Sequence, residues 1–176
     1  TYGTSGDRIL LWFDLIEGNS ISPMGTTASL SKNPKFRVKA VGAFEQKPGC
    51  PDYTSTNISQ EELERICKNE CYNPSDIRKN ISRIEVIKIT PQISEFEKVE
   101  NLIEDSWKTF ECKPSQQGCE IEFTDEEFTE GYRDSIYYVR AIQEPSPVVN
   151  GGNLRCTYNE EGECIKVNIC YGDART

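Results

Sequence analysis

Pro34-Lys-Phe-Arg-Val-Lys-Ala-Val-Gly-Ala-Phe-Glu-Gln46 is the stretch that decides the fold class. Its apolar and charged residues alternate, so that in an extended chain Phe36 and Val38 face one side and Arg37 faces the other. Such alternation is typical of a strand in an antiparallel sheet that has one buried face and one solvated face. The stretch therefore predicts a strand with a core-facing apolar side.

Similar runs recur along the chain, with turn residues between them. Together with the first stretch they predict about seven short strands, which is the number expected for a two-sheet sandwich. We therefore predict a mainly β protein with an immunoglobulin-like two-sheet β-sandwich. The further predicted strands are residues 7–17, 82–90, 106–112, 119–124, 135–144 and 164–169.

Residues 48–74 interrupt this pattern with a Cys-rich segment that shows little β alternation. Ser59 followed by Glu62 forms a capping box, in which each side chain satisfies a backbone donor at the start of a helix. We predict a helical insertion, tied by disulfides to a single β-sandwich domain that covers residues 1–176. We expect this domain to be a fragment of a longer chain.

The chain contains eight cysteines and no histidine, a composition that favours a disulfide framework. Two pairs, Cys112–Cys119 and Cys156–Cys164, each enclose a turn and are candidates for bridges across hairpins. The other four cysteines would then tie the insertion to the sandwich. Zinc is the alternative, because Cys67 and Cys71 would share one face of a helix. The eight cysteines are Cys50, Cys67, Cys71, Cys112, Cys119, Cys156, Cys164 and Cys170.

Charge and hydropathy narrow the range of partners. The chain has 29 acidic and 20 basic residues, and its net charge of -9 repels nucleic-acid phosphates and anionic lipids. No apolar stretch approaches the roughly 20 residues that span a bilayer as a helix. We therefore expect no nucleic-acid partner and no membrane span, and the cysteines predict export to the periplasm, the cell surface or the extracellular space.

Few side chains in this sequence suggest a reaction. Without histidine, the usual base for a serine or cysteine nucleophile is missing. Asp125, Glu126 and Glu127 form an acidic cluster that is a weak calcium candidate, although the EF-hand spacing is absent. We expect this chain by itself to be non-catalytic, with no cofactor and no other metal site.

Six long phrases stand out in the sequence, at residues 41–50, 70–76, 82–86, 137–147, 153–156 and 170–173. They resemble the C-terminal part of one bacterial family, called domain of unknown function 3604. The resemblance implies an exported protein whose N-terminal part is similar to metal-dependent phosphoesterases and holds a divalent metal. Any hydrolase activity would belong to that part, which would also be the partner of this chain.

The sequence thus predicts a non-catalytic accessory β-domain of a larger exported protein. Glu45, Gln46 and Lys47, within the first of the family-like phrases, are the predicted interface residues. The alternative is an independent ligand-binding or adhesive module of a secreted or cell-surface protein. That module would display an exposed aromatic platform, whereas an accessory domain would present a partly apolar surface to its partner.

Overall fold

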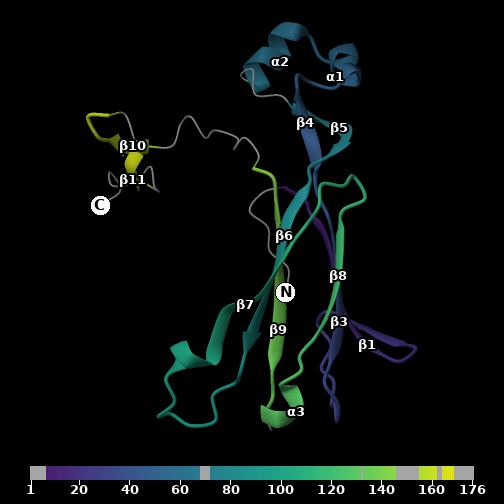
Figure 1. Ribbon diagram of the computed structural model, residues 1–176. Coiled ribbons are helices and arrows are strands. Elements are labelled where there is room, and N and C mark those ends of the chain that lie inside the picture. Colours follow the sequence, from purple (N-terminus) through teal and green to yellow (C-terminus); the bar gives the residue numbers. More distant parts are fainter. Residues whose placement is uncertain (1–6, 68–71, 132, 146–154, 162–163, 169–176) are drawn as a thin grey trace. The chain divides into compact units, whose positions relative to one another are not determined.

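The protein is mainly β, with 48% of its residues in strands and 13% in helices. The computed structural model describes residues 7–67, 72–131, 133–145, 155–161 and 164–168 (Figure 1). The chain divides into two compact units, Thr1–Glu144 and Pro145–Thr176, where the sequence predicts a single domain. Pro145, Pro147 and the pair Gly151-Gly152 follow the first unit, and such residues interrupt strands.

The two larger antiparallel sheets of the first unit contain most of the predicted strands. Sheet A has the order β2-β1-β3-β8 and sheet C has the order β7-β6-β9. The strands of sheet A are β1 (Leu10–Glu17), β2 (Ser20–Pro23), β3 (Lys35–Val41) and β8 (Cys119–Thr124). Those of sheet C are β6 (Ile81–Ile89), β7 (Ile103–Glu111) and β9 (Ile136–Gln143).

A shared core joins the inner faces of these two sheets. Val38 of sheet A and Ile84 and Val86 of sheet C are completely buried within it. Aromatic rings connect the layers, because the Phe36 ring lies 4.7 Å from the ring of Tyr137 and Trp107 meets Phe123 edge-on at 6.1 Å. The alternation of the sequence is therefore confirmed as a burial pattern.

The outer face of sheet A carries the charged residues of the same alternation. Lys35 on β3 forms an ion pair with Glu122 of β8 at 2.6 Å, and Arg37 pairs with Asp14 of β1 at 3.3 Å. These cross-strand pairs lie on the solvent side, where each contributes little to stability. This face therefore carries charged pairs, beside the exposed apolar side chains of Leu10 and Trp12 on β1.

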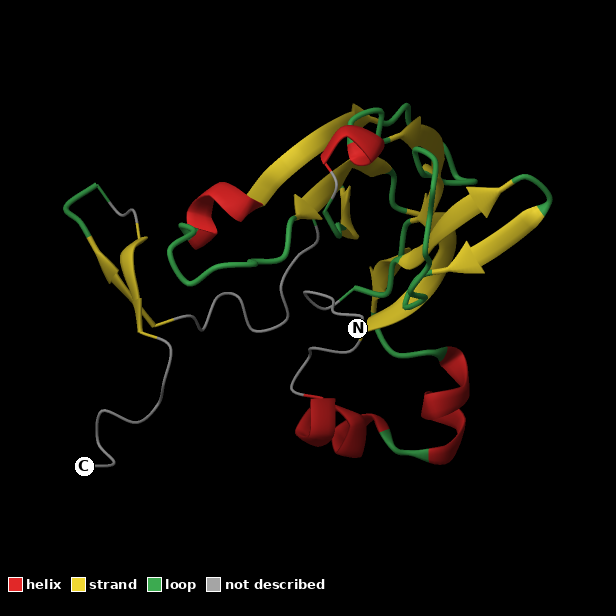
Figure 2. Ribbon diagram, turned by 90° about the horizontal axis from the view of Figure 1, so that it is seen from below, coloured by secondary structure: helices red, strands yellow, loops and turns green. Residues whose placement is uncertain are grey.

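The predicted helical insertion is present, but its base is a separate small sheet. β4 (Phe44–Pro48) pairs with β5 (Tyr72–Arg78), and α1 (Asp52–Asn57) and α2 (Gln60–Cys67) connect them (Figure 2). One half of the predicted capping box is confirmed, since the amide of Glu62 donates to Ser59 Oγ at 3.2 Å.

The predicted strand 34–46 is therefore wrong as a single strand, because it divides into β3 and β4. The break lies at Gly42, where a Cβ would come within 1.9 Å of the Lys79 carbonyl oxygen. Only glycine permits this approach of the two backbones.

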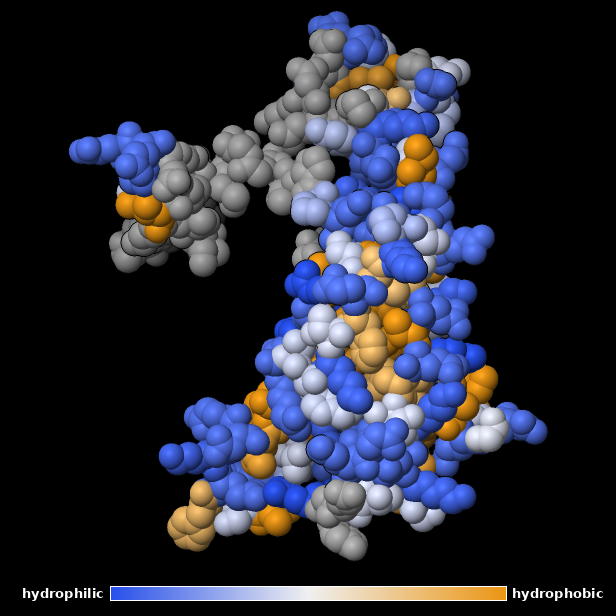
Figure 3. Space-filling view, in the orientation of Figure 1, coloured by the Kyte–Doolittle hydropathy of each residue, from blue (hydrophilic) through white to orange (hydrophobic). Residues whose placement is uncertain are grey.

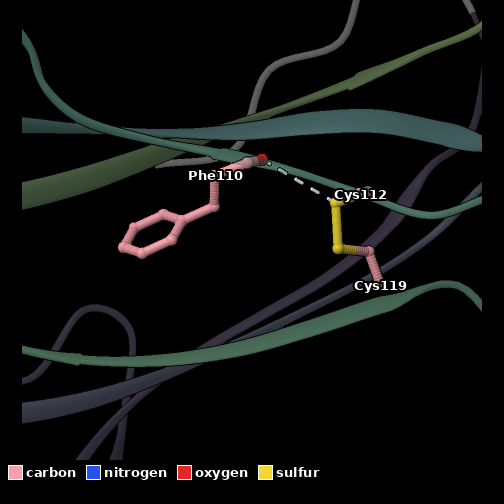
Figure 4. The surroundings of a disulfide bond; sticks show 3 residues. All are labelled: Phe110, Cys112 and Cys119. Carbon is pink, nitrogen blue, oxygen red and sulfur yellow. Dashed lines mark hydrogen bonds between the residues drawn. A yellow bond between two sulfur atoms is a disulfide. The ribbon is translucent and has the colours of Figure 1, made fainter.

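One predicted disulfide is confirmed, and its place in the fold differs from the prediction. Cys112 and Cys119 are bonded with their Cα atoms 5.8 Å apart (Figure 4). They do not bridge a hairpin, because Cys112 follows β7 of sheet C and Cys119 begins β8 of sheet A. The bond therefore joins the two sheets at one end of the core. Cys50 is also disulfide-bonded.

The remaining elements are short. A 3-10 helix, η1 (Val99–Leu102), leads into β7, and α3 (Phe128–Gly131) precedes β9. The second unit contains an antiparallel hairpin of β10 (Arg155–Tyr158) and β11 (Cys164–Asn168). The predicted Cys156–Cys164 bridge depends on side chains outside the described ones, as does any role of Cys67, Cys71 and Cys170.

Candidate functional site

A buried ion pair lies at the end of the core near α3. Lys88 points inward from β6, and its Nζ lies 2.7 Å from Oδ2 of Asp125, which follows β8. The Tyr137 hydroxyl of β9 donates to the same oxygen at 2.5 Å, and the Glu127 amide donates to Oδ1 at 3.1 Å. The network therefore connects both sheets through one fully buried carboxylate.

The surroundings fix the ionisation of the two acidic groups. Burial raises the pKa of Asp125, but the hydrogen bonds from Lys88, Tyr137 and the Glu127 amide outweigh it and hold that pKa below its ordinary value. Burial, followed by the hydrogen bond to Asp125, raises the pKa of the Tyr137 hydroxyl. At neutral pH the carboxylate is thus charged and the phenol is protonated, which suits a structural ion pair.

Two cavities lie beside this network. The smaller, of about 280 Å³, is lined by Lys88, Glu127 and Arg133 among others. The larger, of about 730 Å³, lies under the segment from Met24 to Leu30. Phe128 and Ser135 line both cavities, so the two adjoin.

Exposed apolar side chains lie at one end of the outer face of sheet C, beside the loop between β6 and β7, whereas Arg83, Glu85 and Arg140 form ion pairs farther along this face. Ile103, Ile89 and Ile136 are direct cross-strand neighbours, so their side chains share one face. We call this the isoleucine surface, and Figure 3 shows orange atoms at the lower left, where Figure 1 draws this loop and β7. Its members are the partly buried Ile89 and the exposed Ile93, Phe96, Val99, Ile103, Ile136 and Tyr138.

The loop that carries this surface is held in place by an ion pair. Arg133 donates to both carboxylate oxygens of Glu97, at 2.9 and 3.2 Å, and to the Pro91 carbonyl. The Ile93 amide and Arg133 together lower the pKa of Glu97. Despite this anchoring, Ile93 is 76% exposed and Phe96 is 88% exposed. The loop thus has a defined backbone and presents apolar side chains to solvent.

The predicted interface residues Glu45, Gln46 and Lys47 lie on β4 and are exposed. Gln46 donates to the Phe44 carbonyl at 3.2 Å, within its own strand. The isoleucine surface includes no residue of β4 or β5, so these residues and that surface belong to different elements. Their role as an interface stays a prediction.

The acidic cluster is dispersed by the fold. Asp125 turns into the core and binds Lys88, whereas Glu126 and Glu127 are exposed. Within the described residues, no group of three or more His, Cys, Asp or Glu side chains is placed to hold a metal ion. The described helices likewise include none that is long and apolar enough to cross a bilayer.

Comparison of the chain with protein-family models, curated proteins and solved structures found no match. The resemblance to domain of unknown function 3604 therefore stays a prediction. The site must be judged on its own geometry.

Sequence reasoning missed the two features that stand out in the structure. The strand alternation could have identified Lys88, because it occupies a core-facing position in line with Ile84 and Val86. A lysine that points inward from a strand requires a buried acidic partner. No comparable pattern in the sequence marks the isoleucine surface, because Ile93 and Phe96 follow no strand or helix period.

Proposed function

We propose that this chain is an accessory β-domain, with an immunoglobulin-like sandwich, of a larger exported protein that resembles a metal-dependent phosphoesterase. Its task in this proposal is to dock on the rest of that protein and support it. The observation that carries the proposal is the isoleucine surface, an exposed and largely aliphatic area with an ordered backbone.

The exposure of these side chains is what a docking surface requires. Completely burying a side chain such as isoleucine or phenylalanine contributes roughly 1.5–3 kcal/mol. Ile93 and Phe96 leave most of this unused in the isolated chain, since they are 76% and 88% exposed. Because Glu97 and Arg133 already fix the loop, little conformational entropy is lost when a partner covers it.

The charges around the surface indicate the partner's chemistry. Glu95 and Glu100 lie between the apolar residues of the loop, and within the described residues neither forms an ion pair. A partner face that combines apolar side chains with a rim of Lys or Arg would complement them.

The alternative, an independent ligand-binding or adhesive module, is less well supported. It predicts an aromatic platform, and the exposed aromatic residues are spread over different elements, such as Trp12 on β1, Tyr53 on α1 and Tyr72 on β5. The ring–ring contacts found among the described residues all involve the core aromatics instead.

Ile93→Ser tests the proposal, with Ile21→Ser as the matched control. Both isoleucines are exposed, at 76% and 54%, but Ile21 lies on β2 of the other sheet. In the isolated chain, each change should alter stability by less than about 0.5 kcal/mol, as is usual for surface positions. In the full-length natural protein, Ile93→Ser should destabilise the docked domain by about 1–3 kcal/mol.

Thermal unfolding of both variants, in the isolated chain and in the full-length natural protein, measures these changes in stability. Equal effects of the two substitutions in the full-length protein would contradict docking through this surface. A non-reduced intact mass of 20.0 kDa for the natural protein, the mass of this chain alone, would contradict the larger protein itself.

A further inference from the structure

The larger cavity of the first unit has the size and lining of a small-molecule site. Its volume of about 730 Å³ falls within the roughly 300–1,000 Å³ of ligand pockets. Phe13 and Phe36 of sheet A and Tyr137 of sheet C reach it from the core, and Met24 and Leu30 reach it from the segment above. The cavity is therefore an opening at the end of the sandwich, next to its aromatic core.

The segment from Met24 to Lys32 forms a strap over this opening. One end is fixed by β2, where the Thr26 amide donates to the Pro23 carbonyl at 3.3 Å. The other is fixed by Asn33, which donates to the Glu126 carbonyl at 2.8 Å and accepts from Thr129. Between Thr27 and Lys32, no hydrogen bond to any described residue holds the strap down. The strap can therefore adjust to what lies beneath it.

The lining is apolar with neutral hydroxyls. Ser22, Thr27, Ser29 and Ser135 provide hydrogen-bonding groups, and Asp134 is the one charged side chain among the lining residues, all of which are described. The nearby Asp125 carboxylate presents no charge to the cavity, because Lys88, Tyr137 and the Glu127 amide engage it. An anionic ligand would find no positively charged side chain in the lining, and the net charge of -9 would repel it. Asp134 is exposed to solvent, which screens its attraction for a cation.

We propose that this cavity binds a neutral, mainly apolar small molecule that carries a few hydrogen-bonding groups. The aromatic and aliphatic side chains take up its body, and the hydroxyls at the edge orient it. A folded protein or a nucleic-acid strand does not fit, since the residues at the bottom of the cavity belong to the core. The cavity borders the isoleucine surface, because Ile136 lines both, but the proposal does not depend on the docking function proposed above.

The test uses phenylnaphthylamine, a neutral apolar dye that fluoresces when it leaves water. Ser29→Trp places an indole into the cavity, whereas Ser31→Trp makes the same change on the same exposed strap at a position that does not line it. The wild-type chain should bind the dye in a saturable manner. Ser29→Trp should weaken binding by about tenfold or more, and Ser31→Trp by less than about twofold. Ala28→Trp, at a second lining position, should repeat the loss.

Two controls establish that the dye occupies the cavity and not an unfolded chain or an exposed apolar area. Unfolding temperatures show that the variants are folded, so that a loss of binding reports on the cavity. Phe96→Ser removes the most exposed member of the isoleucine surface and should leave dye binding unchanged. Lack of saturable binding, equal effects of Ser29→Trp and Ser31→Trp, or loss of binding in Phe96→Ser would each overturn the proposal.

Discussion

Replacing Lys88 with methionine removes one charge from the buried ion pair while keeping a side chain of similar length. The Lys88 side chain is 10% exposed and that of Asp125 is completely buried, so the remaining carboxylate cannot be hydrated without opening the core. Removing one partner of a buried pair typically costs about 3–5 kcal/mol. We expect the variant to lose this amount, because Tyr137 and the Glu127 amide alone cannot compensate the charge.

Lys35→Met is the matched control, since Lys35 pairs with Glu122 at a nearly equal distance of 2.6 Å but on the surface. Exposed pairs contribute about 0–1 kcal/mol, and this variant should lose no more. Urea unfolding followed by tryptophan fluorescence measures both losses, because Trp107 packs against Phe123 and Tyr137 in the core and becomes exposed on unfolding. A loss of less than about 1 kcal/mol for Lys88→Met would refute the buried-pair account.

The pH dependence of the stability of Lys88→Met tests the buried pair independently, because it should have the opposite direction from that of the wild type. In the wild type, the folded-state pKa of Asp125 lies below its unfolded value, so the pair stabilises the fold above roughly pH 4 and this contribution is lost as pH falls through the folded pKa. In Lys88→Met, burial is no longer outweighed and should raise this pKa above its unfolded value. The variant should then gain stability as pH falls from 7 toward 4. A pH profile parallel to that of the wild type would contradict this reasoning.

Two further predictions concern the frame around the core. Changing both Cys112 and Cys119 to alanine removes a bridge between residues seven positions apart. By loop entropy this should lower the free energy of unfolding by roughly 2.5 kcal/mol, as measured by urea unfolding. A loss below about 0.5 kcal/mol would contradict the role of the bridge in joining the sheets. Gly42→Ala places a methyl group 1.9 Å from the Lys79 carbonyl oxygen. We therefore expect the free energy of unfolding, followed by thermal unfolding, to fall by more than about 2 kcal/mol. An unchanged stability would show that the close approach of the two backbones is not required.

Local patterns in the sequence predicted the strands that form the core. Residues 119–124 were expected as a strand and form β8 with the same bounds, and the alternation around Val38 matches its burial. These predictions succeed because one buried face imposes a period of two on the sequence. Short strands such as β2, with its exposed and partly polar sequence, leave no such period.

Longer-range features could not be obtained from sequence in the same way. The Cys112–Cys119 bond was a local prediction, but only the sheet order shows that it joins two layers. Gly42 looked like part of one strand, because its constraint comes from Lys79, which is distant in sequence. The isoleucine surface likewise depends on the pairing of β6 with both β7 and β9.

Hydrogen exchange of the backbone amides of residues 92–104 tests the proposed docking most directly. These amides belong to the loop and strand end that carry Ile93, Phe96 and Ile103, and they should be compared in the isolated chain and in the full-length natural protein. We predict at least about tenfold slower exchange in the full-length protein, because docking would bury them and suppress local opening. Equal exchange in the two settings would contradict the claim that this surface binds the rest of the protein.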